Sequence, residues 1–275
     1  MKIIAIIPAY NEEETIGRVI EDMPEIVNEI IVIDDGSTDN TAKIAKEKGV
    51  NIVSFRGNRG LAIAYRVGLK EALKRKADII VSLDADYQHD PKEIPKLIEP
   101  IVKGKADFVI GSRFINKTYK MPLLKYYGNI AFTKLINFLL GLKLTDTQSG
   151  FRAFTKEVAE ILKIKQGFTY TQQTIVQVAY HRFKMIEVPI NAMQRKGKSR
   201  LIKTPLHFAY NAIQLLIFIF AKFYPLRFFI PIGIILMLIG AYIGLLYERN
   251  ILSSLIISTG INSILFGVLF EILKE

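Results

Sequence analysis

Short apolar runs alternate with helical repeats along the first two thirds of the chain. In residues 16–23, for example, Ile16, Val19, Ile20 and Met23 recur at the spacing of one helix face. Repeated strand–helix units of this kind predict an α/β fold with a mostly parallel, Rossmann-like sheet and helices on both faces. The expected strands cover residues 2–7, 29–33, 51–55, 77–81, 106–110 and 185–189.

The pattern changes after residue 203. Residues 204–224 place polar side chains on one helical stripe and apolar ones opposite, which predicts an amphipathic juxtamembrane helix. Residues 228–247 and 251–270 then carry no charge and are each long enough to span a bilayer. We therefore expect a globular domain over 1–203 and two transmembrane helices within 225–275. The alternative is a helix pair buried in a soluble core.

The composition and net charge of the chain favour some classes of binding partner over others. The chain carries 37 basic and 26 acidic residues, a net charge of +11, and 50% of its residues are hydrophobic. Such a charge favours anionic membranes, phosphorylated substrates or nucleic acid, but no nucleic-acid motif accompanies it and the apolar tail favours a membrane. Most of the basic residues lie in the globular domain, so the positive-inside rule predicts that this domain is cytoplasmic. Without cysteine, thiolate chemistry and disulfides are excluded.

Two carboxylates stand one residue apart where one apolar run ends. Asp84 and Asp86 follow the run 77–81. Side chains at i and i+2 of an extended backbone point the same way, so both can reach one hard cation. Mg²⁺ is commonly held by one or two carboxylates together with substrate phosphates, and Mn²⁺ accepts the same oxygen ligands. The pair therefore predicts a metal–diphosphate site. The alternative is a polar loop before the helix that starts at Asp90.

Polar clusters follow three further strands, at residues 10–12, 34–39 and 112–113. The carboxyl ends of parallel strands gather at one edge of the sheet, where open α/β sheets bind their ligands. We therefore expect these clusters to meet the carboxylates of residues 84–88 in one site. Neither a G-x-G-x-x-G motif nor a P-loop opens a helix, so dinucleotide and P-loop binding are not supported.

Five motifs carry a family resemblance over roughly residues 1–200. They are Pro8-Ala9-Tyr10-Asn11-Glu12, Asp34-Asp35-Gly36-Ser37, Asp84-Ala85-Asp86 with Gln88-His89, Gly111-Ser112-Arg113 and Ser149-Gly150-Phe151-Arg152. In this order the chain resembles family 2 glycosyltransferases, above all the dolichol-phosphate mannose synthase and polyprenyl-phosphate glycosyltransferase branch. The resemblance implies a GT-A fold, a nucleotide-sugar donor, a divalent metal (Mg²⁺ or Mn²⁺) and transfer with inversion.

The resemblance also implies roles for individual residues. Tyr10 and its neighbours would line the nucleoside pocket, and Asp35 would bond the base. Arg195 and Ser199 belong to the segment Arg195-Lys196-Gly197-Lys198-Ser199, which resembles a basic family loop that can fold over the diphosphate and exclude water; the alternative is a basic patch drawn to anionic lipid. The expected nucleotide-sugar contacts are Pro8, Tyr10, Glu12, Asp34, Asp35, Asp84, Ala85, Asp86, Arg195 and Ser199, and the expected metal ligands are Asp84, Asp86 and Gln88.

On the acceptor side, the expected phosphate ligands are Arg113, Lys125, Asn129 and Ser149, and Arg113 joins Asp84 and Asp86 as a catalytic residue. A lipid monophosphate is nearly a dianion at neutral pH, so it needs cations to hold it and no general base. Relatives commonly carry Glu in a following helix, where this chain has Gln172 and Gln173. Since Gln173 cannot accept a proton as a base, a phosphate acceptor fits better, with Asp146 as the alternative base.

These inferences predict a membrane-anchored, metal-dependent inverting glycosyltransferase. It would move a sugar from a nucleoside diphosphate to a polyprenyl (dolichyl) phosphate at the cytoplasmic membrane face. The alternatives are transfer to a saccharide hydroxyl and a non-catalytic membrane scaffold that binds nucleotide sugars. Nothing in the sequence separates uridine from guanosine donors or one hexose from another.

Overall fold

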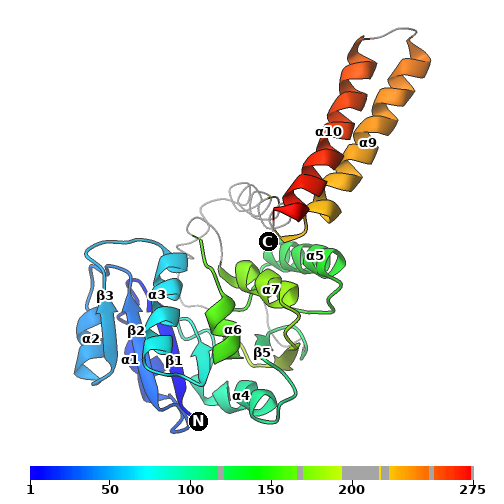
Figure 1. Cartoon of the computed structure of the whole chain (residues 1–275). Coiled ribbons are helices and arrows are strands. Elements are labelled where there is room, and N and C mark those ends of the chain that lie inside the picture. The colour runs from blue at the N-terminus through cyan, green and yellow to red at the C-terminus, as the bar shows by residue number, and fades with distance from the viewer. Residues whose placement is uncertain (117–120, 166–169, 194–216, 218–222, 248–250, 274–275) are drawn as a thin grey trace. The chain divides into compact units, whose positions relative to one another are not determined.

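The computed structural model describes residues 1–116, 121–165, 170–193, 217, 223–247 and 251–273 (Figure 1). It divides into two compact units, Met1–Lys198 and Ser199–Glu275, and each is considered by itself below. Arg195, Ser199 and nearly all of the expected amphipathic helix over 204–224 lie outside the described residues. The domain boundary expected at residue 203 falls there too and stays a prediction.

Unit 1 is built on a seven-stranded sheet with the order β3-β2-β1-β4-β6-β5-β7. Neighbouring strands pair in parallel except at β6, which runs antiparallel to both β4 and β5. The mostly parallel sheet expected from the sequence is therefore confirmed, and β6 is an additional strand. The strands are β1 Ile3–Ala9, β2 Glu29–Asp34, β3 Asn51–Ser54, β4 Ile79–Ser82, β5 Phe108–Ser112, β6 Arg152–Thr155 and β7 Met185–Pro189.

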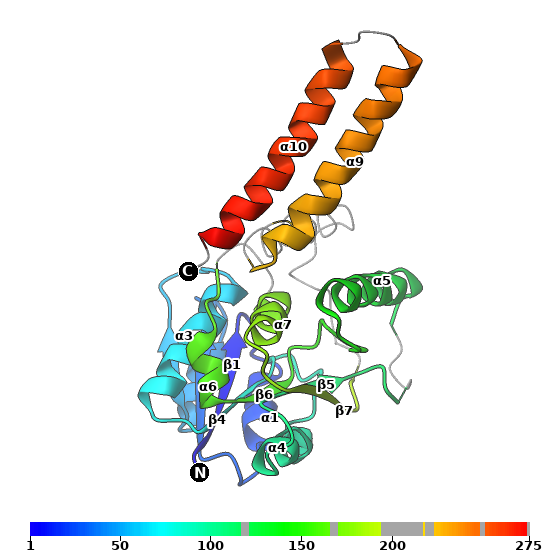
Figure 2. The same ribbon diagram turned by 45° about the vertical axis from the view of Figure 1, so that its right-hand side comes forward.

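Helices cover both faces of this sheet, as the two views in Figures 1 and 2 show. The reason lies in β1, where every residue is buried and alternate side chains point to opposite faces. Ile3, Ala5 and Ile7 pack in one core with α1 (Ile16–Glu21), α2 (Thr41–Glu47) and α4 (Ile94–Val102). The other face is covered by α3 (Leu61–Lys74), α6 (Lys156–Ile161) and α7 (Tyr170–Tyr180), while α5 (Leu123–Leu140) follows β5.

The helical segment that leads into α4 begins at Asp90, as the sequence predicts. Asp90 accepts a hydrogen bond from the backbone N–H of Lys92 and caps the 3₁₀ turn η1 (Pro91–Glu93), which leads into α4. Proline at the first position of this turn needs no hydrogen-bond partner for its nitrogen. The cap therefore fixes where the loop carrying residues 84–89 ends.

The reversed strand β6 decides which loops reach the carboxyl edge of the sheet. Since β6 is antiparallel, its first residue, Arg152, lies opposite Ser82 at the end of β4. The segment before it, residues 149–151, therefore arrives at the same edge as the loops that follow β1, β2, β4 and β5. Ser82 Oγ donates to the Gly150 carbonyl at 2.9 Å, which holds that segment beside β4.

Unit 2 contains α9 (Pro225–Leu246) and α10 (Ile251–Ile272), two helices apolar and long enough to span a membrane. They pack through small residues: Gly233 and Gly240 on α9 and Gly260 and Gly267 on α10 are buried. Ser253 Oγ also donates to the Gly240 carbonyl at 2.7 Å. Close backbone approach through glycine and serine hydrogen bonding are typical of helix pairs in lipid. Only 11% of the most apolar stretch of either helix is buried, unlike helices in a soluble core.

Candidate active site

Hydrogen bonds tie together the loops that follow β1, β2 and β4. Asn11 N–H donates to Ser37 Oγ at 2.9 Å, and Glu12 N–H donates to Thr41 Oγ1 at 2.8 Å. Thr15 Oγ1 donates to the Ala85 carbonyl at 2.7 Å. The structure thus brings the expected nucleotide-binding motifs around Tyr10, Asp34 and Asp84 to one edge of the sheet, and Pro8 lies within β1 beside them.

The loop after β4 presents its polar side chains on one side. Asp84, Asp86 and Gln88 are each partly exposed, whereas Leu83, Ala85, Tyr87 and His89 are buried. This alternation is the i, i+2 pattern on which the metal prediction depends. Among the described residues no group of three or more acidic, histidine or cysteine side chains could hold a metal by itself. Two carboxylates suit a cation that takes its remaining ligands from phosphate and water.

Tyr87 holds this loop in a strained conformation. Its φ of 55° lies in the left-handed region, which a bulky side chain rarely adopts. The Arg18 guanidinium stacks on its ring at 4.0 Å, and its hydroxyl donates to Asp22. Asn11, in the loop after β1, also has a positive φ of 54°. Strain of this kind persists only where surrounding contacts enforce it, and it gathers at binding and catalytic sites.

Asp34 and Asp35 are both buried and both organise backbone. Asp34 accepts from Ser37 N–H at 3.0 Å, and Asp35 accepts from the N–H groups of Arg59 and Gly60 at 2.7 and 2.9 Å. Burial raises the pKa of the Asp35 carboxyl, although those two hydrogen bonds partly offset the effect. Both carboxylates therefore hold turns of the backbone, and contact of Asp35 with a base stays a prediction.

Gly150 lies against the first carboxylate of the metal motif. A β-carbon at this position would stand 2.7 Å from Asp84 Oδ2 and 2.6 Å from the hydroxyl oxygen of Tyr170. Tyr170 is buried, stacks on Tyr65 with ring centroids 4.0 Å apart, and bonds Asp84. Burial and the negative charge of Asp84 raise the pKa of the Tyr170 hydroxyl, so it remains a proton donor to that carboxylate. Glycine at 150 therefore makes room for Asp84.

We expect Gly150→Ala to lower the rate of sugar transfer at least about tenfold, because the new methyl group must displace Asp84 or Tyr170. Crowding of this kind costs stability as well, about 1–3 kcal/mol. Gly128→Ala on α5 is the matched control, since a β-carbon there meets nothing within 4 Å. Initial rates and melting temperatures of both variants check the expectation. A fully active Gly150→Ala enzyme would contradict it.

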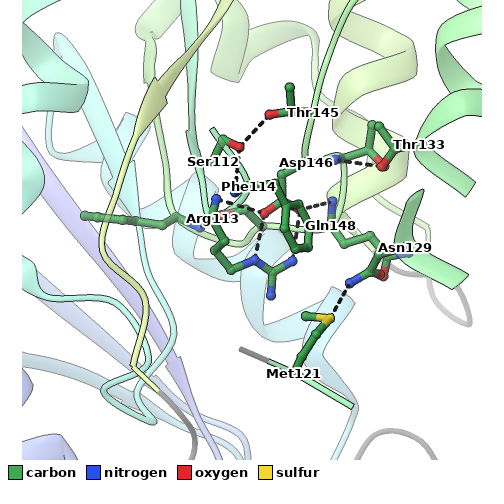
Figure 3. A network of polar contacts seen from close by, with 12 residues as sticks. Ser112, Arg113, Phe114, Met121, Asn129, Thr133, Thr145, Asp146 and Gln148 are labelled. Carbon is green, nitrogen blue, oxygen red and sulfur yellow. Dashed lines mark hydrogen bonds and ion pairs between the residues drawn. The ribbon is translucent and has the colours of Figure 1, made fainter. Parts of the chain in front are cut away.

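Arg113 is held by a buried carboxylate (Figure 3). Its Nε and Nη2 donate to the two oxygens of Asp146 at 2.7 and 2.9 Å, and its backbone N–H donates to the same carboxylate at 3.2 Å. The Asp146 side chain is fully buried, and that of Arg113 is 11% exposed. A bidentate pair fixes the plane of the guanidinium as well as its position. This places the expected acceptor ligand firmly at the end of β5.

The ionisation of Asp146 follows from the same contacts. Burial alone would raise its pKa, but the charge of Arg113 and the hydrogen bonds from Arg113 and Gln148 outweigh burial and lower the pKa. A buried, paired carboxylate with a lowered pKa is a poor proton acceptor. The structure therefore argues against Asp146 as the general base of a hydroxyl-acceptor mechanism.

Glu187 in β7 holds the backbone of Asp146, the partner of Arg113, in place. Its carboxylate accepts from Asp146 N–H at 2.8 Å, from Thr145 N–H at 2.6 Å and from Thr145 Oγ1 at 2.9 Å. Ser112 Oγ lies 2.6 Å from Thr145 Oγ1 in turn. Burial raises the pKa of Glu187, and the hydrogen bonds from the 145–146 backbone oppose that rise. The segment carrying Asp146 is thus fixed to two strands.

The other expected acceptor ligands lie on or beside α5. Lys125, Asn129, Thr133 and Asn137 follow at intervals of four residues and so share one face of the helix. Thr133 Oγ1 lies 3.0 Å from Thr147 Oγ1, and Asn137 bonds Leu144, so this face meets the 144–147 segment. Lys125 is exposed, and Asn129 Nδ2 contacts the Met121 sulfur at 3.7 Å (Figure 3). Ser149 is buried, and its Oγ accepts from Phe151 N–H at 3.3 Å.

Arg152 and Gln173 have structural partners. Arg152 is fully buried and donates to the carbonyls of Thr147, Ser149 and Thr171. These bonds join residues 147–149 to α7. The amide of Gln173 accepts from Lys165 N–H at 2.8 Å and donates to the Lys165 carbonyl at 3.1 Å. The uncharged amide of Gln173 therefore serves to hold the backbone at Lys165.

Comparison with known proteins identifies the family. The sequence profile of Glycosyl transferase family 2 matches residues 4–162, more than half of the chain. The chain belongs to glycosyl transferase family 2. The resemblance inferred from the five motifs is thereby confirmed, and with it the assignment as a glycosyltransferase.

Named relatives of this glycosyltransferase match most of its length. The UDP-N-acetylglucosamine–dolichyl-phosphate N-acetylglucosaminyltransferase of Methanococcus voltae is 37% identical over 215 residues, which cover 70% of this chain and 85% of that protein. The undecaprenyl-phosphate mannosyltransferase of Micrococcus luteus is 30% identical over 217 residues, 73% of this chain and 88% of that one. The polyprenol monophosphomannose synthase of Mycolicibacterium smegmatis is also 30% identical.

Solved structures confirm the GT-A fold. Glucosyl-3-phosphoglycerate synthase from Mycobacterium tuberculosis, in complex with Mn²⁺, UDP-glucose and phosphoglyceric acid, superposes with a TM-score of 0.63 over 80% of this chain and 79% of that one. The two sequences are 22% identical, so this likeness concerns the fold alone.

Sequence reasoning missed two residues of the candidate site. Glu187 is a charge between Ile186 and Val188 in an apolar strand, and that interruption was a usable signal. Tyr170 belongs to an aromatic stretch and was not connected with Asp84, because 86 positions separate the two along the chain. Contacts between residues so far apart in the chain form only when it folds.

Proposed function

We propose that this glycosyltransferase moves a sugar from a nucleoside diphosphate to a polyprenyl (dolichyl) phosphate, with inversion and with Mg²⁺ or Mn²⁺. The bidentate Arg113–Asp146 pair carries the proposal. It sets a rigid guanidinium at the same sheet edge as Asp84 and Asp86. A planar guanidinium suits a phosphate oxygen better than a neutral sugar hydroxyl. The dolichyl- and polyprenyl-phosphate acceptors in the names of three relatives agree with this chemistry.

The donor side rests on the loop after β4. Asp84, Asp86 and Gln88 would hold the cation, which supplies charge neutralisation for the departing diphosphate. The hydroxyl of Tyr170 keeps Asp84 in place, and the buried Tyr87 keeps the loop in its strained turn. Tyr10 and Glu12 would line the nucleoside pocket, since Asn11 and Glu12 bond the segment that follows β2. Asp35 would accept from an N–H of the base.

The transfer step needs no proton acceptor from the protein. A phosphate oxygen of the acceptor attacks the anomeric carbon, a new C–O bond forms, and the bond from that carbon to the donor diphosphate breaks. Arg113, aided by Lys125 and Asn129, would orient the acceptor phosphate, whose second pKa near 6 leaves it largely dianionic at neutral pH. The low pKa of Asp146 supports this route over attack by a saccharide hydroxyl, which would require a base.

We propose the membrane as the site of the reaction, with unit 1 in the cytoplasm. The two apolar helices of unit 2 support anchoring, and the excess of Lys and Arg in the rest of the chain supports the orientation. Arg195 and Ser199 would close over the donor diphosphate.

Transfer to a defined lipid tests the proposal. The full chain, purified in detergent, is incubated with labelled UDP- and GDP-sugars, either cation, and polyprenyl phosphate or the matching polyprenol. We expect label in the lipid only with the phosphate and only with the cation, and EDTA should abolish it. Label on polyprenol or on a free saccharide, with polyprenyl phosphate inert, would overturn the proposal in favour of a hydroxyl acceptor.

A further inference from the structure

Both ends of helix α1 are bonded to the loop that follows β4. Thr15, which precedes the first turn of the helix, donates from Oγ1 to the Ala85 carbonyl at 2.7 Å. Asp22, which follows the last turn, accepts a hydrogen bond from the Tyr87 hydroxyl. Tyr87 itself is buried in the core that α1 shares with the sheet. One short helix therefore holds the loop on both sides of Asp86, an expected cation ligand.

The carboxylate of Asp22 connects the middle of this loop to its end. Oδ2 accepts from Tyr87, and Oδ1 lies 2.8 Å from the Nζ of Lys92, in the turn η1 at which the loop ends. Arg18 Nε lies 3.6 Å from Oδ2, and the Arg18 guanidinium stacks on the Tyr87 ring. Hydrogen bonds from Lys92 and Tyr87 lower the pKa of Asp22, so the acceptor is an ionised carboxylate at neutral pH. We call Arg18, Asp22, Tyr87 and Lys92 the Asp22 cluster.

A contribution to global stability does not account for this cluster. The side chains of Arg18 and Lys92 are each 64% exposed, and ion pairs of such groups add little to the free energy of unfolding. Tyr87 has a φ of 55°, which a bulky residue keeps only where its surroundings impose it. The contacts of the Asp22 cluster therefore act on the conformation of the loop.

The backbone at Tyr87 sets the relation between the two side chains next to it. Asp86 Oδ1 accepts from Gln88 N–H at 3.1 Å across the bend. The loop is fixed before the bend at Ala85, and after it the Gln88 carbonyl accepts from Met193 N–H at 2.8 Å. Rotation of residue 87 to a negative φ would therefore turn Asp86 and Gln88 relative to each other.

We propose that Asp22 and Tyr87 are positioning residues through which helix α1 holds residues 85–88 in the conformation that binds a divalent cation. This inference rests on the proposed cation site at Asp84, Asp86 and Gln88. Neither Asp22 nor the Tyr87 side chain is needed as a ligand, because each acts through the backbone of the loop. Residues that orient metal ligands from outside commonly change the affinity for the metal about 10- to 100-fold when they are replaced.

The same helix starts in the loop that is expected to bind the nucleoside. The backbone N–H groups of Thr15 and Ile16 donate to the Glu12 carbonyl at 3.1 and 2.9 Å. Glu12 N–H is bonded to Thr41 in turn, at the start of α2. Helix α1 therefore holds the cation loop at a fixed place relative to the loop after β1.

Hydrogen exchange of the ligand-free, full-length protein tests the inference without any cation or acceptor. Tyr87→Phe removes only the hydroxyl, and Asp22→Ala removes the carboxylate. Glu21→Ala is the matched control, because this neighbouring carboxylate also forms an exposed ion pair, with Lys48 at the end of α2. Loss of a hydrogen bond to a charged group should speed exchange of the amides of residues 84–89 about tenfold in the first two variants, and not in the control.

Binding of Mn²⁺ in the presence of UDP or GDP tests the consequence for the site, with the free ion followed by electron paramagnetic resonance. We expect the Kd for Mn²⁺ to rise about tenfold in Tyr87→Phe and Asp22→Ala and to stay unchanged in Glu21→Ala. The melting temperatures of Asp22→Ala and Glu21→Ala without ligands should be similar, since each loses one exposed carboxylate.

Unchanged exchange, or an unchanged Kd for Mn²⁺, in both Tyr87→Phe and Asp22→Ala would overturn the inference. An unmodified protein that binds no Mn²⁺ with either nucleotide would instead overturn the proposed cation site. The exchange rates of residues 84–89 would then decide by themselves whether α1 holds the loop, because they are measured without the cation.

Discussion

Asp146→Asn is expected to destabilise unit 1 by about 3 kcal/mol, the loss typical of a buried ion pair that keeps one partner. Four N–H groups point at this carboxylate, from the backbone and side chain of Arg113 and from Gln148. Asparagine offers only one oxygen, so its amide nitrogen must face another donor. Chemical unfolding, together with the KM for polyprenyl phosphate, checks the effect. The KM should rise because Arg113 is no longer fixed.

A double variant separates stability from function. Removing both charges with Arg113→Met and Asp146→Leu should recover most of the lost stability, because no unpaired charge stays buried, while transfer remains lost.

The pH dependence of the free energy of unfolding is a second test of Asp146→Asn. Because the pKa of Asp146 is lowered on folding, its contribution to stability is present above the unfolded value of 3.8 and is lost as the pH falls through the lower folded value. Asp146→Asn should lack this pH-dependent contribution to stability. An equally stable Asp146→Asn protein with unchanged KM would contradict the positioning role.

The contrast between predicted and unpredicted elements has a physical basis. Each strand expected from the sequence is a run of mostly apolar residues, and burial of such runs is a local signal. The missed strand β6 begins with Arg152, a charge that the sequence gives no reason to bury. It can be buried because the carbonyls of Thr147, Ser149 and Thr171, from two separate segments, accept its hydrogen bonds. That arrangement exists only after the chain has folded.

The site shows the same limit. The i, i+2 pattern of Asp84 and Asp86 could be recognised because it depends on neighbouring residues, and the alternating exposure of residues 83–89 agrees with it. The partner of Arg113 could not, since Asp146 lies 33 positions away and was considered only as an alternative base. Gly150 is recognisable in the sequence only as part of a motif, whereas its nearest neighbours across space are Asp84 and Tyr170. Contacts between distant segments therefore decide what the motif residues do.

Asp86→Asn should lower kcat about a hundredfold or more, which corresponds to a loss of about 3 kcal/mol in transition-state stabilisation. The substitution keeps the shape of the side chain and an oxygen that can still accept from Gln88 N–H, a bond of 3.1 Å in the structure. Only the negative charge is removed, and that charge is what a divalent cation beside a diphosphate requires. The melting temperature without ligands should therefore stay close to that of the unmodified protein.

Melting temperatures measured with and without ligands make the test specific for cation binding. In the unmodified enzyme, Mg²⁺ and a nucleoside diphosphate together should raise the melting temperature, because they bind the folded state alone. Asp86→Asn should lose most of that rise, whereas Glu47→Gln, which removes an exposed charge at the end of α2, should keep it. If Asp86→Asn retained both the rise and normal turnover, the cation would have to be bound elsewhere. The partly exposed Asp84, Asp86 and Gln88 would then belong to a polar loop before η1, the alternative raised by the sequence.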